Sequence, residues 1–161
     1  MLPADLPFVK DAWMRSFRRE RAAGVIPMAD YFTVYGFVLD QVIARPGCSV
    51  LIAASDACDE PEYNAVGFLC YERGVSLRRG DVNVRSSDAV VHYAYTKQAM
   101  RKMGVARFLF ESAGIDPYLP FFYTFETADA RKLRVKIPAS KCNPLIARYP
   151  KETQQVEARN P

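Results

Sequence analysis

The sequence has few of the residues that build metal sites or disulfide frameworks. Its 161 residues include four cysteines and one histidine, His92. The cysteines are far apart, with no CxxC pair, and a single histidine cannot complete a usual zinc set with them. We therefore expect no metal site and interpret the cysteines as buried or partly buried thiols of a reducing compartment, with a disulfide as the alternative. They are Cys48, Cys58, Cys70 and Cys142.

Long apolar runs are also absent. No run of about 18 apolar residues exists, and the most apolar stretch, 31–44, is interrupted by Asp40 and Gln41. The residues 1–5 have neither a basic segment nor a long apolar one, so we expect no secretory signal peptide. These absences predict a cytoplasmic protein that does not bind a membrane.

Neither sign of charge dominates the chain. There are 22 basic and 18 acidic side chains, which gives a net charge of +4. This mild excess favours anionic ligands but does not require nucleic acid, and no nucleic-acid motif is present, so binding through a basic loop is a minor alternative. With 50% hydrophobic residues, the sequence is that of a folded protein. We expect one domain over residues 1–149 and a polar C-terminal tail over 150–161.

Hydrophobic periodicity predicts the elements of an α+β fold. Apolar residues recur at helical spacing after Asp5, a potential cap, and again over 28–44. Short apolar runs then predict strands, the first two of which form an antiparallel hairpin. The segment 74–87 is polar, with a turn expected at 78–81, and Gly114 is expected just after the helix that begins near Gly104. The predicted strands are 49–54, 65–72, 89–96, 120–126 and an edge strand at 143–149; the last helix is 128–136. The order αα-ββ-β-α-β-α-β predicts helices around a mixed sheet.

Residues 89–114 carry the most chemical information, because a strand, a basic turn with a glycine and a helix follow one another. Between residues 89 and 110 there are four basic side chains and no acidic one. Backbone N–H groups at a helix N-terminus attract a diphosphate, and Gly104 allows close approach. Arg101 and Lys102 would neutralise its charge. The alternative is a solvated basic loop.

The turn Arg101-x-x-Gly104-x-Ala106 resembles the Q/R-x-x-G-x-G/A motif of GNAT acyl-CoA N-acyltransferases, in which it also follows a strand and opens a helix. The wider order is similar over residues 5–133, and the opening residues 5–18 also resemble phage-encoded GNAT-like proteins. The resemblance implies a GNAT-like, mostly antiparallel mixed sheet flanked by helices. It also implies N-acetyltransferase activity with acetyl-CoA as co-substrate and no metal. A primary amine, either a small molecule or a protein lysine or N-terminus, would attack the thioester directly. Many relatives form homodimers, which allows a homodimer here.

The resemblance further implies where acetyl-CoA binds. The end of the strand before the motif would hold the pantetheine arm and polarise the thioester carbonyl through its backbone, and the turn would hold the diphosphate. The implied cofactor-binding residues are Tyr95, Thr96, Arg101, Lys102, Met103, Gly104, Val105 and Ala106.

The sequence departs from the family at the positions of the acid and the base. Arg134 stands where the family often has a tyrosine general acid, and Val90 stands where some members have a glutamate base. His92, on the same strand face as Val90, is the first candidate base, and Glu72 is the second. The structural alternatives are a packed histidine and a solvated strand end.

Two tyrosines, Tyr123 and Tyr149, could donate a proton, although packing alone would account for each. These departures leave a second function open. It is a catalytically inactive GNAT-like fold that acts as an interaction or virion protein.

Overall fold

The computed structural model describes residues 5–20, 24–55, 64–75, 77–79, 82–84, 88–137, 139–144 and 146. Two helices begin the chain because apolar residues repeat on one face of each. α1 (Leu6–Arg18) buries Val9, Ala12 and Trp13, and α2 (Met28–Ile43) buries Tyr31, Leu39 and Val42. Both predicted helices are confirmed. Asp5 occupies the N-cap position of α1, but its side chain makes no capping hydrogen bond there.

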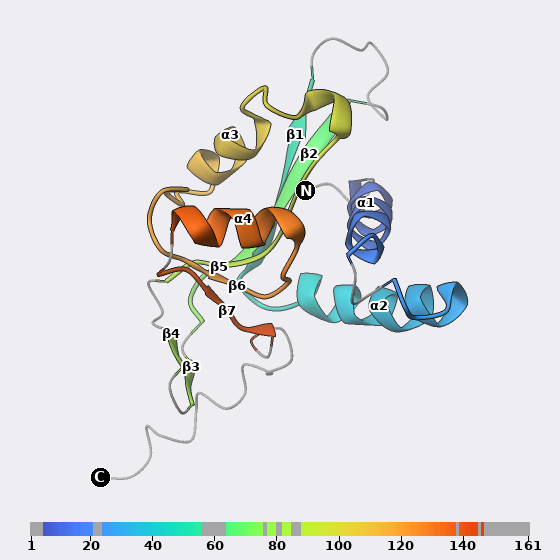
Figure 1. The fold of residues 1–161 in the computed structure, drawn as a ribbon, viewed down its shortest axis with the longest axis horizontal. Helices are drawn as coiled ribbons and strands as arrows, with labels where there is room; N and C mark the ends of the chain where they lie inside the picture. Colours follow the sequence, from blue (N-terminus) through green and yellow to red (C-terminus); the bar gives the residue numbers. More distant parts are fainter. Residues whose placement is uncertain are drawn as a thin grey trace.

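A five-stranded mixed sheet forms the centre of the fold, in the order β1-β2-β5-β6-β7 (Figure 1). Its long strands are β1 (Cys48–Ala54), β2 (Ala65–Glu72) and β5 (Val90–Thr96), paired antiparallel. The short strands β6 (Phe122–Tyr123) and β7 (Lys141–Cys142) extend the sheet in parallel. The α+β class and the mixed sheet flanked by helices that the sequence predicts are therefore confirmed.

The helices cover the sheet on both faces. α1 and α2 lie on one face, whereas α3 (Val105–Ser112) and α4 (Ala128–Lys136) lie on the other (Figure 1). Trp13 and Phe68 belong to the buried cluster under α1 and α2, and Leu69 and Leu109 belong to the cluster under α3. Gly114 has the positive φ of 64° expected after the end of α3.

Three predictions about the strands need correction. The strand expected over 120–126 shrinks to β6, because the chain turns away from β5 after Tyr123. The edge strand expected at 143–149 is wrong in its described part; β7 lies earlier, and Pro144 has no N–H for a ladder. The polar segment contains a separate hairpin of β3 (Leu77–Arg79) and β4 (Val82–Val84), where a turn alone was expected at 78–81. A 3₁₀ turn (Gln98–Met100) follows β5.

The described cysteines are free thiols, with Cys70 buried and Cys48 and Cys142 partly buried, as expected. Cys58 and the tail 150–161 lie outside the described residues. Among the helices that the structure describes, none is long and apolar enough to cross a membrane.

Candidate functional site

β5 and β6 separate in the middle of the sheet. They pair only through Val90 with Phe122 and Val91 with Tyr123, and the last bond is from Thr124 N–H to Val91 O at 3.1 Å. At the same point β5 carries an extra residue relative to β2, because Cys70 lies opposite Tyr93 and Tyr71 opposite Val91. A bulge of this kind bends its strand and increases its twist. The bulge at His92 therefore gives a physical reason for the opening between the strands.

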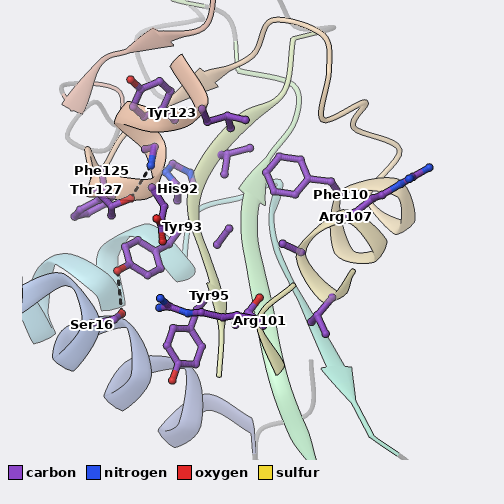
Figure 2. Close-up of a pocket in the computed structure, with 18 of the residues that line it drawn as sticks. Ser16, His92, Tyr93, Tyr95, Arg101, Arg107, Phe110, Tyr123, Phe125 and Thr127 are labelled. Atoms are coloured by element: carbon purple, nitrogen blue, oxygen red, sulfur yellow. Dashed lines mark hydrogen bonds between the residues drawn. The ribbon is translucent and has the colours of Figure 1, made fainter. Parts of the chain in front are cut away.

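The opening is a cleft of about 520 Å³ that passes through the sheet. Ser16 of α1 lines it on one side, and Phe110 and Arg107 of α3 line it on the other (Figure 2). Its walls include members of both buried clusters, Tyr93 from the α1 side and Val91 from the α3 side. Two ligands that enter from opposite faces of the sheet could therefore meet beside β5.

The basic turn closes one end of the cleft. Gly104, the N-cap residue of α3, has a φ of 83°, and a Cβ added there would meet no atom within 4 Å. Lys102 also has a positive φ, 66°, which is uncommon for a residue with a side chain. The first helical bond runs from Phe108 N–H to Gly104 O, so the N–H groups of residues 105–107 are not used inside the helix. An anion fits this turn, because these donors, the helix dipole and the basic side chains act together.

The structure brings seven of the eight predicted cofactor residues to the cleft. Tyr95, Thr96, Arg101, Lys102, Gly104, Val105 and Ala106 all line it. Met103 does not line the cleft, and the residue is 67% exposed.

The backbone of β5 faces the cleft through Thr96, as expected, and through Ala94 in place of Tyr95. Lys97 N–H donates to the carbonyl oxygen of Val66, the residue opposite it on β2. In an antiparallel pair every second residue bonds to the partner strand, so Lys97 and every second residue before it direct their backbone groups to β2. Tyr95 is one of these. The backbone N–H and C=O of Thr96 and Ala94 point the other way, toward the opening. Thr96 was expected from the sequence, but Ala94 was not.

The two candidate bases lie together in the interior. His92 Nε2 is 3.2 Å from Glu72 Oε2, and His92 Nδ1 is 3.1 Å from Thr124 Oγ1. Arg45 Nε lies 3.1 Å from the same Glu72 oxygen. Because a carboxylate only accepts, Nε2 carries the proton and Nδ1 accepts from Thr124. The side chains of His92 and Glu72 are both 0% exposed.

These contacts occupy both ring nitrogens of His92, so neither is available to a ligand. Burial lowers the pKa of His92, while the hydrogen bond and charge of Glu72 oppose that shift. His92 lines the cleft but uses both ring nitrogens within the protein, and Glu72 is not part of the lining. The structure thus brings the predicted pair together, but away from the open part of the cleft.

Polar groups that the sequence did not single out lie on the α1 side of the cleft. Tyr93 Oη is 2.9 Å from Ser16 Oγ, as Figure 2 shows. Glu20 receives Ala128 N–H at 3.0 Å and Arg131 at 3.1 Å, so the end of α1 is bonded to the start of α4. Asp129 lines the cleft nearby. No local pattern joins these residues, because α1, β5 and α4 meet only in the folded chain.

The helix that carries Arg134, the residue at the family's tyrosine position, makes other contacts in this chain. Thr127 caps α4 by accepting the N–H of Ala130 at 3.1 Å. Arg134 lines the cleft and pairs with Glu126 at 3.2 Å. Tyr123 also lines the cleft, and burial raises the pKa of its hydroxyl. Tyr149 lies outside the described residues.

No protein-family model matches the sequence, and no curated protein matches it either. The solved structures that are similar to the chain include two acetyltransferases. The acetyltransferase from Vibrio fischeri is 17% identical with a TM-score of 0.43, over 71% of this chain and 80% of that one. The ribosomal-protein-alanine N-acetyltransferase from Brucella melitensis biovar Abortus is 16% identical with a TM-score of 0.43, over 83% of this chain and 87% of that one.

Proposed function

We propose that the protein is an acyl-CoA-dependent N-acyltransferase that moves an acetyl group from acetyl-CoA to a primary amine. The observation that carries this proposal is the cleft through the sheet, with an anion-binding turn at one end. Its volume of about 520 Å³ lies within the usual range for ligand sites, roughly 300–1,000 Å³. A cleft lined by residues from both faces of the sheet suits a reaction between two separate substrates.

Acetyl-CoA would bind along the α3 side. Its diphosphate would accept hydrogen bonds from the N–H groups of Val105 and Ala106, with Arg101 and Lys102 beside it. The pantetheine arm would follow β5, where the free backbone groups of Ala94 and Thr96 could pair with its amides. A backbone N–H in the opening would stabilise the oxyanion that forms on the thioester carbonyl.

The amine would reach the thioester from the α1 side. It binds as an ammonium, loses one proton to water and attacks the carbonyl carbon. The N–C bond forms and the C–S bond breaks, and the second amine proton ends on the CoA sulfur. The cleft would contribute mainly the positioning of the two reactants and the stabilisation of the oxyanion. Positioning of well-oriented reactants can lower the activation barrier by about 7–11 kcal/mol.

His92 and Glu72 would act as positioning residues in this scheme. They join β2 to the chain just beyond β6 and hold the bulge from which the cleft opens. A role as the catalytic base would require the histidine to leave Thr124 or Glu72.

Acetyl-CoA binding to Gly104→Glu tests the site. The added carboxylate would occupy the place of the diphosphate and repel it. Gly74→Glu is the matched control, because Gly74 also has a positive φ, 72°, and open space, but lies outside the cleft. At 100 times its dissociation constant, acetyl-CoA should add about 2.7 kcal/mol of stability to the wild type and to Gly74→Glu. Equal binding by Gly104→Glu would refute the site.

Release of free CoA thiol in the presence of amines tests the reaction itself. A panel of small amines, a lysine peptide and a peptide with a free N-terminus covers the acceptor classes. Acetyl-CoA binding without thiol release on any of them would reject the enzyme and favour a binding protein.

A further inference from the structure

The α1 side of the cleft has a chemical character of its own. It is lined by a hydroxyl, two carboxylates and three aromatic rings whose edges border the opening, and the residues are Ser16, Glu20, Asp129, Tyr93, Tyr95 and Phe125. Arg101 and Lys102 of the basic turn line the same cleft. The α1 side therefore offers a ligand other side chains than the basic turn does.

Hydrogen bonding at Tyr93 leaves an acceptor facing this space. Ser16 Oγ lies 2.5 Å from Ala12 O, so the single hydroxyl proton of Ser16 is donated there. In the 2.9 Å contact between the two side chains, Tyr93 is consequently the donor. The phenol oxygen then offers only lone pairs to a ligand. An ammonium, which has three donors and no acceptor, complements it, and a carboxylate does not.

The charges around Tyr93 favour a cation as well. Burial raises the pKa of Tyr93 to about 12. The hydrogen bond with Ser16 opposes that rise, and the negative charges of Glu20 and Asp129 add to it. The same negative potential that opposes a phenolate attracts an ammonium.

The carboxylates of Glu20 and Asp129 already bind other groups of the protein. Glu20 holds Ala128 N–H and Arg131, and Asp129 lies 3.3 Å from Lys132. They contribute a field but no second free anion, so the geometry suits one positive charge. A ligand with two ammonium groups would leave the second one unmatched.

The rest of this space is aromatic and firmly packed. Phe125 contacts Trp13 and Phe17 edge-on, each with ring centroids 5.2 Å apart, and its centroid is 6.4 Å from that of Tyr93. Ring edges and faces of this kind bind a flat apolar body and attract a cation.

We propose that the α1 side of the cleft is an acceptor subsite for a small primary monoamine with an aromatic body, held as its ammonium by Tyr93 Oη in the field of Glu20 and Asp129. The proposal rests on the proposed function for its place in a reaction. The binding of the amine, however, does not depend on acetyl-CoA.

The experiment is direct titration of the full chain with 2-phenylethylamine, followed by calorimetry, without any acyl donor. Two comparison ligands isolate the features of the amine. 2-Phenylethanol has the same ring without the charge, and 1,4-diaminobutane has two charges without a ring. The amine should bind at least about tenfold more tightly than either, since hydrogen bonds to charged groups are the stronger ones. Equal or weaker binding of the amine would overturn the proposal.

Variants identify the site. Tyr93→Phe keeps the ring and should weaken 2-phenylethylamine about tenfold while leaving 2-phenylethanol unchanged. Tyr118→Phe makes the same chemical change outside the cleft and should have no effect. A Tyr93→Phe protein that binds both ligands as the wild type does, or loses both equally, would refute the role of the oxygen.

Glu20→Gln provides an independent readout if Tyr93→Phe folds poorly. The amide keeps an oxygen for Ala128 N–H but removes the charge. It should weaken the amine at low salt and not the alcohol, and unchanged amine binding would count against the proposed field.

Acetyl-CoA binding measured on the same samples separates this proposal from the proposed function. Selective amine binding without acetyl-CoA binding would refute the enzyme and leave the subsite. Acetyl-CoA binding without preference for the amine would refute the subsite alone.

Discussion

Replacement of Glu72 by glutamine distinguishes a positioning role from a catalytic one. The substitution keeps the shape of the side chain and removes its charge. It leaves the guanidinium of Arg45, only 11% exposed, without its counter-ion, and weakens the bond that orients His92. Loss of one partner of a buried ion pair costs about 3–5 kcal/mol. For a chain of this length that corresponds to a fall in Tm of roughly 10 °C.

Urea and thermal unfolding followed by circular dichroism measure this change. Asp11→Asn serves as the control, because its partner Arg15 is 70% exposed and Asp11 is 56% exposed. Loss of that surface pair should cost less than about 1 kcal/mol. If Glu72→Gln unfolds like the control but abolishes acetyl transfer, the structural argument is refuted and Glu72 is the base.

Three further expectations follow from single contacts. The free energy of unfolding should fall as the pH drops below about 6.5. The histidine of the unfolded state then binds a proton, whereas buried His92, with its lowered pKa, stays neutral. His92→Gln should flatten that part of the stability profile, and an equally steep profile would exclude His92 as its source. Gly67→Ala would place its Cβ 2.6 Å from Tyr95 O. The substitution should therefore destabilise the protein by about 1–3 kcal/mol and weaken acetyl-CoA binding. Gly36→Ala is the control, because it has space around its Cβ and should have neither effect. Thr127→Ala should cost about 1 kcal/mol by removing the cap of α4; no change in urea unfolding would mean that Glu20 alone caps the helix.

Local chemistry explains which elements could be predicted. α1, α2, β2 and α4 follow from periodicity that depends on neighbours only a few residues away. The observed bounds of α2, β2 and α4 match the prediction closely, whereas α1 ends at Arg18, before the stop expected at Gly24. Gly104 and Gly114 were recognisable because a glycine beside a helical pattern commonly takes positive φ, as both do.

The edges of the sheet could not be predicted in the same way. The apolar run 120–126 resembles a complete strand, yet only Phe122 and Tyr123 pair with β5. A strand ends where its partner leaves it, and that partner is about thirty residues away along the chain. The bulge at His92 arises from register with β2, which is likewise invisible in a single run of residues.

The candidate site also has one part that could be predicted from local sequence and one part that could not. The basic turn is a contiguous motif and could be read from the sequence. The α1 side could not, because Ser16, Tyr93 and Asp129 are separated by tens of residues and meet only through the packing of α1 and α4 against β5. His92 is a candidate in the sequence because of its titration range and its place on the strand face of Val90, and neither criterion reveals its burial.

The position of His92 explains why a buried polar group occurs in the middle of this sheet. An extra residue in β5 opens the sheet toward β6, and an opened sheet loses the ladder bonds that would hold the two strands at a fixed distance. His92 restores a connection at that point, since its ring bonds Glu72 on β2 and Thr124 just beyond β6. The residue that creates the opening thus also fixes its narrow end. The width of the cleft then depends on the contacts of His92 with Glu72 and Thr124. A substitution that weakens these contacts should impair the binding of both proposed substrates before it affects any chemical step.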